Sequence, residues 1–152
     1  MTSQNLTSLQ HQFSGWEQAQ EYYVEANLTD GLPIVPPSED RVRAMLEFAG
    51  LPPDQVIGVE KIRQKHITAE KVAINAVMAG CRPEYFPVVL ATIEAALKPE
   101  FSMHGLLATL WFSGPVIIVN GPVSKRIGMN WGGNVFGQGN RANATIGRAI
   151  QL

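Results

Sequence analysis

The stretch of this sequence best suited to bind a small molecule is residues 128–140, which are rich in glycine and asparagine. These two residue types tolerate the positive φ angles that repeated turns require. Asn140 is a favoured N-cap residue, so a helix is expected to begin at Arg141. A helix N-terminus carries unpaired N–H groups and a partial positive charge, which favour an anion. The loop and its helix therefore predict a binding site for a carboxylate or a phosphate.

The helix after this loop carries cationic side chains on one face. Arg141, Thr145 and Arg148 are spaced i, i+4 and i+7, which aligns them along a helix. Guanidinium groups bind carboxylates and phosphates through paired hydrogen bonds. The alternative is a surface loop followed by a solvent-exposed arginine face. We predict that these three residues bind substrate, because a loop of this composition is more typical of function than of simple connection.

Asparagine side chains near the loop add neutral hydrogen-bonding groups. An amide can polarise a carbonyl or hold an oxyanion without adding charge, although the same side chain also forms Asx turns. The asparagines assigned to substrate binding on this ground are Asn120, Asn130, Asn134 and Asn140. The loop matches neither the glycine fingerprint of dinucleotide-binding proteins nor a P-loop, so it gives little support to nucleotide binding.

Cys81 is the only cysteine, which excludes an internal disulfide and a cysteine-based zinc site. It lies between two predicted helices, with Arg82 adjacent. A nearby cation and a helix N-terminus lower a thiol pKa and favour the thiolate, the state of a nucleophilic or redox cysteine. The alternative is a small buried residue at a helix junction. We predict Cys81 as a catalytic residue and Arg82 as a substrate-binding residue.

Lys71 and Asn75 interrupt an otherwise apolar helix at positions i and i+4. A lysine inside an apolar helix is costly unless its charge is paired or used, and Glu84 at the start of the next helix is a candidate partner. The alternatives are a lysine that extends its charged end to solvent and an asparagine that bonds to the backbone. We predict Lys71 and Glu84 as catalytic and Asn75 as substrate-binding.

His104 precedes a predicted strand, where a histidine is well placed to act as a general base. The other two histidines, His11 and His66, lie in polar segments and carry no prediction. Because the three histidines are scattered, no metal-ligand spacing is present. We predict His104 as catalytic and expect no metal, and the sequence names no other cofactor.

The composition excludes several classes of protein. A net charge of −1 and the lack of a basic block argue against binding to nucleic acid. No apolar run reaches membrane-spanning length, and no signal peptide is present at the N-terminus, so we expect a cytoplasmic protein. Charged residues make up only 16% of the chain, below the usual quarter. This scarcity indicates surface that a partner covers.

The expected organisation is a mobile tail over residues 1–13 and one α/β domain over residues 14–152. Apolar spacing and cap residues predict helices at residues 15–27, 39–49, 69–80, 83–97 and from 141 onward. Strands are predicted at 56–59, 106–112 and 115–120, with an exposed loop at 60–67. The continuous apolar run Val116–Val119 is typical of a strand buried on both faces. The predicted fold is a mixed sheet flanked by helices.

The predicted last helix has an apolar stripe and no glycine or asparagine cap after it. We expect a longer parent protein or a partner that covers this end. The alternative is simple fraying.

Four segments resemble a poorly characterised bacterial family: residues 29–37 (TDGLPIVPP), 70–85 (EKVAINAVMAGCRPEY), 119–122 (VNGP) and 139–148 (GNRANATIGR). Members are similar to the N-terminal part of longer proteins associated with UGSC-type thiol or selenol proteins. The resemblance implies a larger parent or a separate second subunit, and thiol-linked or redox chemistry. It places the predicted residues between 71 and 84 in one motif. Residues 110–113 (LWFS) are less polar than the resemblance leads us to expect, so it assigns that stretch no active-site role.

The leading hypothesis is a small subunit, or N-terminal half, of a hetero-oligomeric enzyme. It would act as a lyase, hydrolase or thiol-dependent reductase on a small anionic or carbonyl substrate, with a second protein subunit or another copy completing the assembly. One alternative is a non-catalytic structural or regulatory partner of an enzyme. Another is a carrier that binds a small anion without turnover.

Overall fold

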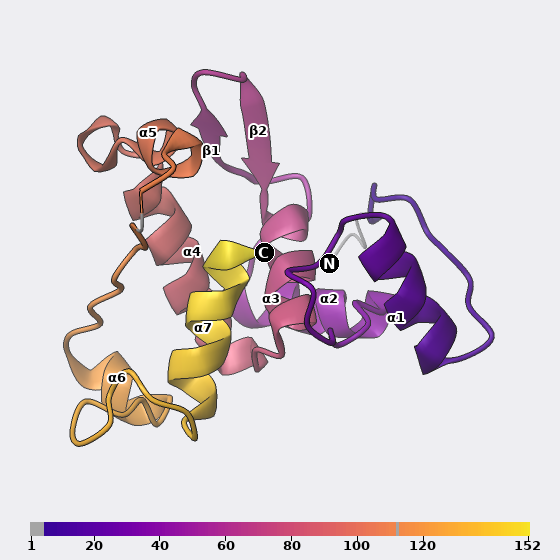
Figure 1. Ribbon diagram of the computed structural model, residues 1–152. Coiled ribbons are helices and arrows are strands. Elements are labelled where there is room, and N and C mark those ends of the chain that lie inside the picture. Colours follow the sequence, from indigo (N-terminus) through magenta and orange to yellow (C-terminus); the bar gives the residue numbers. More distant parts are fainter. Residues whose placement is uncertain (1–4, 112) are drawn as a thin grey trace.

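The structure, a computed structural model, describes residues 5–111 and 113–152. The helices are α1 (Trp16–Glu25), α2 (Glu39–Ala49), α3 (Ala69–Ala79), α4 (Phe86–Ala96), α5 (Met103–Ala108), α6 (Pro122–Arg126) and α7 (Arg141–Gln151). Short 3-10 turns η1 (Pro83–Tyr85) and η2 (Pro99–Phe101) flank α4. Strands β1 (Val56–Glu60) and β2 (Lys65–Thr68) form an antiparallel hairpin, which is the only sheet among these residues. The fold is therefore mostly helical with little sheet (Figure 1).

Helix α3 forms the centre of the core. Thr68 caps it by accepting a hydrogen bond from the Lys71 amide, and Gly80 ends it in the left-handed conformation that glycine adopts without strain. Small side chains such as Ala73 and Ala76, both fully buried, let neighbouring helices approach closely. Helices α2, α4 and α7 pack against α3 (Figure 1). Helix α3 is therefore the element that the other helices of the core contact.

The sequence located most helices correctly. The helices predicted at 15–27, 39–49, 69–80 and from 141 onward correspond to α1, α2, α3 and α7, and the helix predicted at 83–97 forms as η1 followed by α4. Asn140 caps α7 as expected, accepting from the Asn143 amide at 2.9 Å. The loop prediction for 60–67 was wrong at both ends, because Glu60 belongs to β1 and residues 65–67 belong to β2. Strand β2 pairs with β1 across a tight turn.

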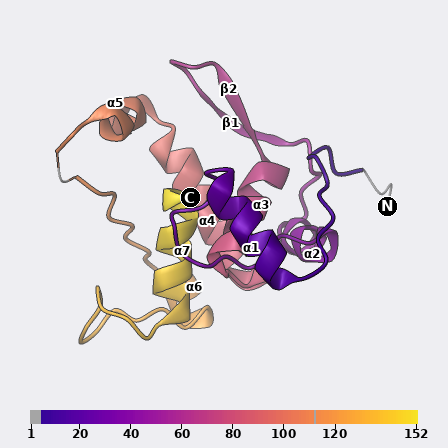
Figure 2. The same ribbon diagram turned by 45° about the vertical axis from the view of Figure 1, so that its right-hand side comes forward.

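The mixed sheet was the main error. Of the strand predicted at 106–112, residues 106–108 belong to α5, residues 109–111 form neither helix nor strand, and residue 112 lies outside the described residues. Residues 113–120 form neither helix, strand nor turn. This segment is nevertheless strand-like in one respect, since Pro115, Ile117 and Val119 are half-buried while Val116, Ile118 and Asn120 are exposed. It runs along the outer edge of the molecule in both views (Figures 1 and 2). The apolar pattern thus indicated a strand, but no other described segment pairs with it.

Across the described residues, every helix is too short or too polar to cross a lipid bilayer.

Candidate functional site

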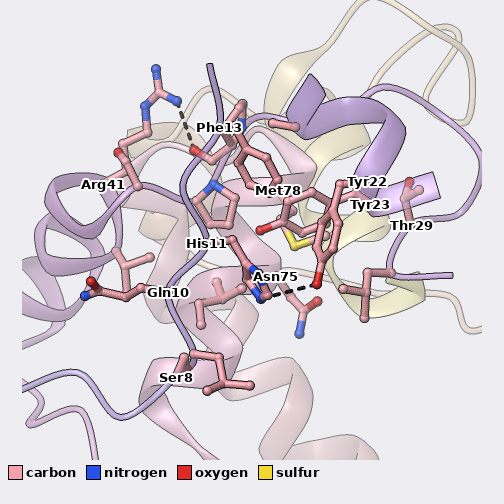
Figure 3. Close-up of a pocket in the computed structure, with 18 of the residues that line it drawn as sticks. Ser8, Gln10, His11, Phe13, Tyr22, Tyr23, Thr29, Arg41, Asn75 and Met78 are labelled. Atoms are coloured by element: carbon pink, nitrogen blue, oxygen red, sulfur yellow. Dashed lines mark hydrogen bonds between the residues drawn. The ribbon is translucent and has the colours of Figure 1, made fainter. Parts of the chain in front are cut away.

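A cavity of about 1220 Å³ lies between the N-terminal segment, α1 and one face of α3. Figure 3 shows side chains from these three elements pointing into it. Residues after α1 and the start of α2 complete the wall. The polar and aromatic residues that line it include Ser8, Gln10, His11, Tyr22, Tyr23, Thr29, Arg41, Lys71 and Asn75. This cavity combines several such groups on one concave surface, so it is the candidate functional site.

Glu70 holds the N-terminal segment over this cavity. Its carboxylate is 1% exposed and accepts the backbone N–H groups of Thr7 and Ser8 at 2.9–3.1 Å and the Thr7 hydroxyl at 2.8 Å. Burial alone would raise the pKa of Glu70, but the hydrogen bonds from Ser8 and Thr7 outweigh it and hold the pKa at about 2. Residues 1–13 were expected to be a mobile tail; residues 1–4 lie outside the described part of the chain, and Thr7 and Ser8 are anchored at this point.

His11 and Tyr22 form a polar pair at the cavity wall. The Tyr22 hydroxyl lies 3.3 Å from His11 Nε2, and the two rings are in contact with Phe13. Figure 3 shows the pair beside Asn75 of α3. Burial, and then the neighbouring Tyr22, raise the pKa of Tyr23. The His11–Tyr22 pair places an imidazole nitrogen and a phenol hydroxyl within hydrogen-bond distance at the cavity wall.

Lys71 and Asn75 reach the same cavity from α3. Lys71 is exposed, which agrees with the alternative that its charged end extends to solvent, and its ammonium donates to the Ser8 hydroxyl at 2.9 Å. Its predicted partner Glu84 is exposed on η1, beyond the other end of α3. Asn75 Nδ2 donates to the Lys71 carbonyl at 3.1 Å, which leaves its amide oxygen available as an acceptor. These two residues confirm the expected i, i+4 alignment, although the lysine is not paired with a carboxylate.

The other charged groups around the cavity already have partners within the chain. Arg41 donates to the Pro36 carbonyl, and Glu39 pairs with Arg43. Asp30 accepts two hydrogen bonds from Arg148 at 2.8 and 2.9 Å, and these hold the pKa of Asp30 well below its usual range. Lys71 and Arg41, each bound to a neutral acceptor, are consequently the two lining cations whose charge no described carboxylate pairs.

Cys81 lies outside this cavity, in the contact between α3 and α7. It is buried, and its thiol donates to the Thr145 carbonyl at 3.3 Å. The expectation of a lowered thiol pKa was wrong, because burial outweighs both that hydrogen bond and the nearby Arg141 and raises the pKa of Cys81. Arg82 is exposed just beyond α3. The pKa and burial of Cys81 are those of a structural thiol.

The cationic face of α7 is engaged within the chain. Arg141 donates twice to the Gly80 carbonyl, at 2.8 and 3.0 Å, and so caps the end of α3. Thr145 donates to the Arg141 carbonyl within the helix. Arg148 binds Asp30 and the Leu32 carbonyl. The predicted alignment of these residues is therefore present, but their donors point at protein acceptors.

The asparagines of the 128–140 loop also bond to the loop itself. Asn130 forms an Asx turn by accepting the Gly132 amide and donating to Gly133. Asn140 Nδ2 donates to the Gly128 carbonyl. Asn134 adopts a positive φ of 58°, and its amide occupies the space where a side chain on Gly137 would lie. The loop geometry is thus explained by internal hydrogen bonds.

The remaining predicted residues lie on the opposite flank. His104 is on α5 rather than before a strand, with Nδ1 3.9 Å from a Glu60 oxygen. Asn120 is exposed and lines a second cavity, of about 720 Å³, between α4, α5 and residues 113–120. The lining of that cavity is mostly apolar. The predicted residues are therefore spread over the molecule, and of them only Lys71 and Asn75 line the candidate site.

Several residues of the site were not identified from the sequence. His11 and Tyr22 were missed because they come from segments whose own patterns give no sign of a shared cavity. Glu70 did carry a signal, because a carboxylate within the apolar run 69–79 must find donors when that helix is buried. Asn143 was also missed, although it joins Asn130 to Val135 through its side-chain amide. Long-range partners of this kind leave little trace in local sequence.

The described residues contain no group of three or more histidine, cysteine, aspartate or glutamate side chains that could hold a metal ion. Comparisons with protein-family models, with curated proteins and with solved structures find no match to this chain.

Proposed function

We propose that the chain is an enzyme subunit that performs acid–base chemistry on a small carbonyl compound bound in the cavity beneath the N-terminal segment. The observation that carries this proposal is the His11–Tyr22 pair, 3.3 Å apart, on the wall of a cavity that also receives Lys71 and Asn75. Histidine and tyrosine are common proton-transfer groups, and a positioned pair accelerates such steps by roughly 10²–10⁴. The class proposed is a lyase or a hydrolase.

Each side chain has a distinct role in this proposal. His11 would accept a proton from the carbon next to the carbonyl or from an attacking water. The Tyr22 hydroxyl and the Lys71 ammonium would stabilise the negative charge that develops on the carbonyl oxygen. The free amide oxygen of Asn75 would orient a hydroxyl or amine of the substrate. A carboxylate on the substrate would be attracted by Lys71, which has no carboxylate partner of its own.

A thiol-dependent reductase receives less support from the geometry. A nucleophilic thiol needs access and a lowered pKa, whereas Cys81 is buried and donates to Thr145. The resemblance to UGSC-associated proteins still suggests thiol chemistry, which another chain of an assembly would then supply. The proposed reaction does not use Cys81, and Cys81→Ser should retain turnover.

The test is solvent-proton exchange. Pyruvate, an anionic ketone, and dihydroxyacetone, a neutral one, are incubated with the chain in D₂O, and loss of the α C–H signal is followed by NMR. Hydrolysis of p-nitrophenyl acetate covers the hydrolase branch. We expect rates above those of buffer, lowered about 10²-fold or more by His11→Gln and Tyr22→Phe. His66→Gln, at an exposed histidine of β2, is the matched control. Equal rates for the unmodified chain and for His11→Gln in both assays would contradict the proposal.

A second candidate is a non-catalytic partner subunit. It is favoured by the large apolar side chains exposed on one flank, with Leu110 99% and Trp111 84% exposed. Exposed apolar surface of this extent marks interaction sites. The same surface is compatible with an enzyme that works as an oligomer.

A further inference from the structure

We propose that residues 115–119 are an edge strand that pairs antiparallel with the same residues of a second copy of this chain, around a two-fold axis. The inference is independent of the proposed reaction, because this flank is separate from the cavity that holds His11 and Tyr22. It concerns the segment between α5 and α6, where the sequence predicts a buried strand and the structure supplies no strand partner.

The backbone of this segment has unused hydrogen-bonding groups. No described residue accepts a hydrogen bond from the backbone N–H groups of residues 116–120 or donates to their carbonyls. Water satisfies such groups on a surface, but an extended apolar segment with a free edge is the usual template for adding a strand. The missing element is therefore a strand rather than a helix or a loop.

The side chains of the segment alternate as those of a strand do. Ile117 and Val119 pack against the core, whereas Val116 and Ile118 are 67% and 78% exposed. Residues that lie opposite each other in an antiparallel pair point to the same face. In a two-fold pair centred on residue 117, Val116 of each copy lies opposite Ile118 of the other. The four exposed side chains then form one apolar cluster, while the inward faces remain on the core.

Charge favours a second copy as the partner. Residues 105–124 contain no charged side chain, so two copies meet without repulsion, whereas a charged partner would bury an unpaired charge. The two-fold arrangement also satisfies both edges with a single contact, as isologous dimers do.

The exposed apolar area is of the size that a stable dimer needs. The flank exposes Leu107, Leu110, Trp111, Val116 and Ile118. An aliphatic side chain of this kind buries roughly 60–120 Å² and an aromatic one about 150–250 Å², so complete coverage of these five side chains would bury roughly 500 Å² of apolar area per copy. Since interfaces are a little over half apolar, the expected total approaches the roughly 800 Å² per partner of a standard interface.

The first experiment measures the mass of the full chain by light scattering after size exclusion, from about 1 to 100 µM. We expect a dimer that Ile118→Lys converts to a monomer with an unchanged circular dichroism spectrum. Ile62→Lys, which adds the same charge at an exposed isoleucine of the hairpin turn, should remain dimeric. A chain that is monomeric throughout would overturn the proposal. So would a dimer that survives Ile118→Lys, or a complex formed only with another protein.

A second experiment tests the register without relying on loss of binding. Single cysteines are placed at 116, 117 and 118 and oxidised. Opposed residues in an antiparallel pair have Cα atoms about 4.5–5.5 Å apart, within reach of a disulfide. The variant with cysteine at 117 should form a disulfide-linked dimer and the other two should not, because only the residue on the axis lies opposite itself. The unmodified chain is the control, since Cys81 is buried. Absence of cross-linking in all three variants would overturn the two-fold pairing.

Discussion

Two segments without regular structure behave in opposite ways: residues 5–13 near the N-terminus and residues 113–120 between α5 and α6. The first is polar and looked mobile, yet Glu70 fixes its backbone through Thr7 and Ser8. The second is apolar and looked like a buried strand, yet its backbone has no partner among the described residues. Figures 1 and 2 show the second segment running along the edge of the molecule, whereas Thr7 and Ser8 of the first are hydrogen-bonded to α3.

The difference shows what an apolar pattern does and does not determine. Alternation indicates which side chains avoid water, but it does not identify the surface that covers them. A polar segment, in contrast, becomes ordered when one buried acceptor needs its N–H groups, because an unsatisfied buried carboxylate is costly. One residue of α3 therefore has more effect on the N-terminal segment than the composition of that segment.

Of the changes proposed here, removal of the Glu70 carboxylate, which anchors Thr7 and Ser8, should have the largest effect on stability. Glu70→Gln replaces a carboxylate that accepts several N–H and O–H donors with an amide that presents two donors of its own. We expect the free energy of unfolding to fall by about 3 kcal/mol, because hydrogen bonds to charged groups contribute roughly 1.5–3 kcal/mol and the remaining donors lose their partner. Urea denaturation measures the change. Glu84→Gln, at an exposed carboxylate, is the control and should lie within about 0.5 kcal/mol of the parent.

Acid should break the same anchor. The folded pKa of Glu70, about 2, lies below the roughly 4.3 of an unfolded glutamate. The corresponding stability is therefore fully present above about pH 4.3 and is lost as the pH falls toward 2, and it amounts to about 3 kcal/mol. Unfolding free energies measured across this window should fall more steeply for the parent chain than for Glu70→Gln. Parallel pH profiles would show that Glu70 is not responsible.

Helix positions could be predicted because their signals are local. Thr68 and Gly80 bracket α3, and Asn140 begins α7, as the sequence indicated. The hairpin was only half recognised, since β2 depends on pairing with β1 across a turn rather than on its own apolar content. Pairing between distant residues is the kind of information that a single sequence carries least.

The candidate site was predicted only where it lies on one helix. Lys71 and Asn75 were found from their spacing on α3. His11 and Tyr22 were not, because their contact joins an irregular segment to a separate helix. Arg141 and Arg148 were expected to hold an anion, but internal acceptors on Gly80 and Asp30 use their donors. The spacing of arginines alone does not show whether their donors bind a ligand or an acceptor within the chain.

Amide hydrogen exchange sharpens the comparison directly. In the Ile118→Lys chain, which is expected to be monomeric, the Thr7 and Ser8 amides should exchange about 100-fold or more slowly than those of Ile117 and Val119. An opening free energy near 3 kcal/mol corresponds to a protection of this size. In the parent chain the Ile117 and Val119 region should gain protection as concentration rises. Exchange that is equally fast in both segments would remove the proposed difference between them.

The smallest effect isolates one hydroxyl of the anchor. Thr7 donates its side-chain O–H to Glu70 at 2.8 Å, in addition to its backbone N–H. Thr7→Val keeps the shape and the backbone hydrogen bonds, so we expect a loss of about 1 kcal/mol in urea denaturation. Thr7→Ser retains the hydroxyl and should restore most of it. A loss for Thr7→Val as large as that for Glu70→Gln would mean that the side-chain contact, rather than the backbone amides, holds the segment. In that case the order of residues 5–13 would depend on the polar side chain of Thr7, and the difference from residues 113–120 would come from side-chain composition rather than from the backbone contacts with Glu70.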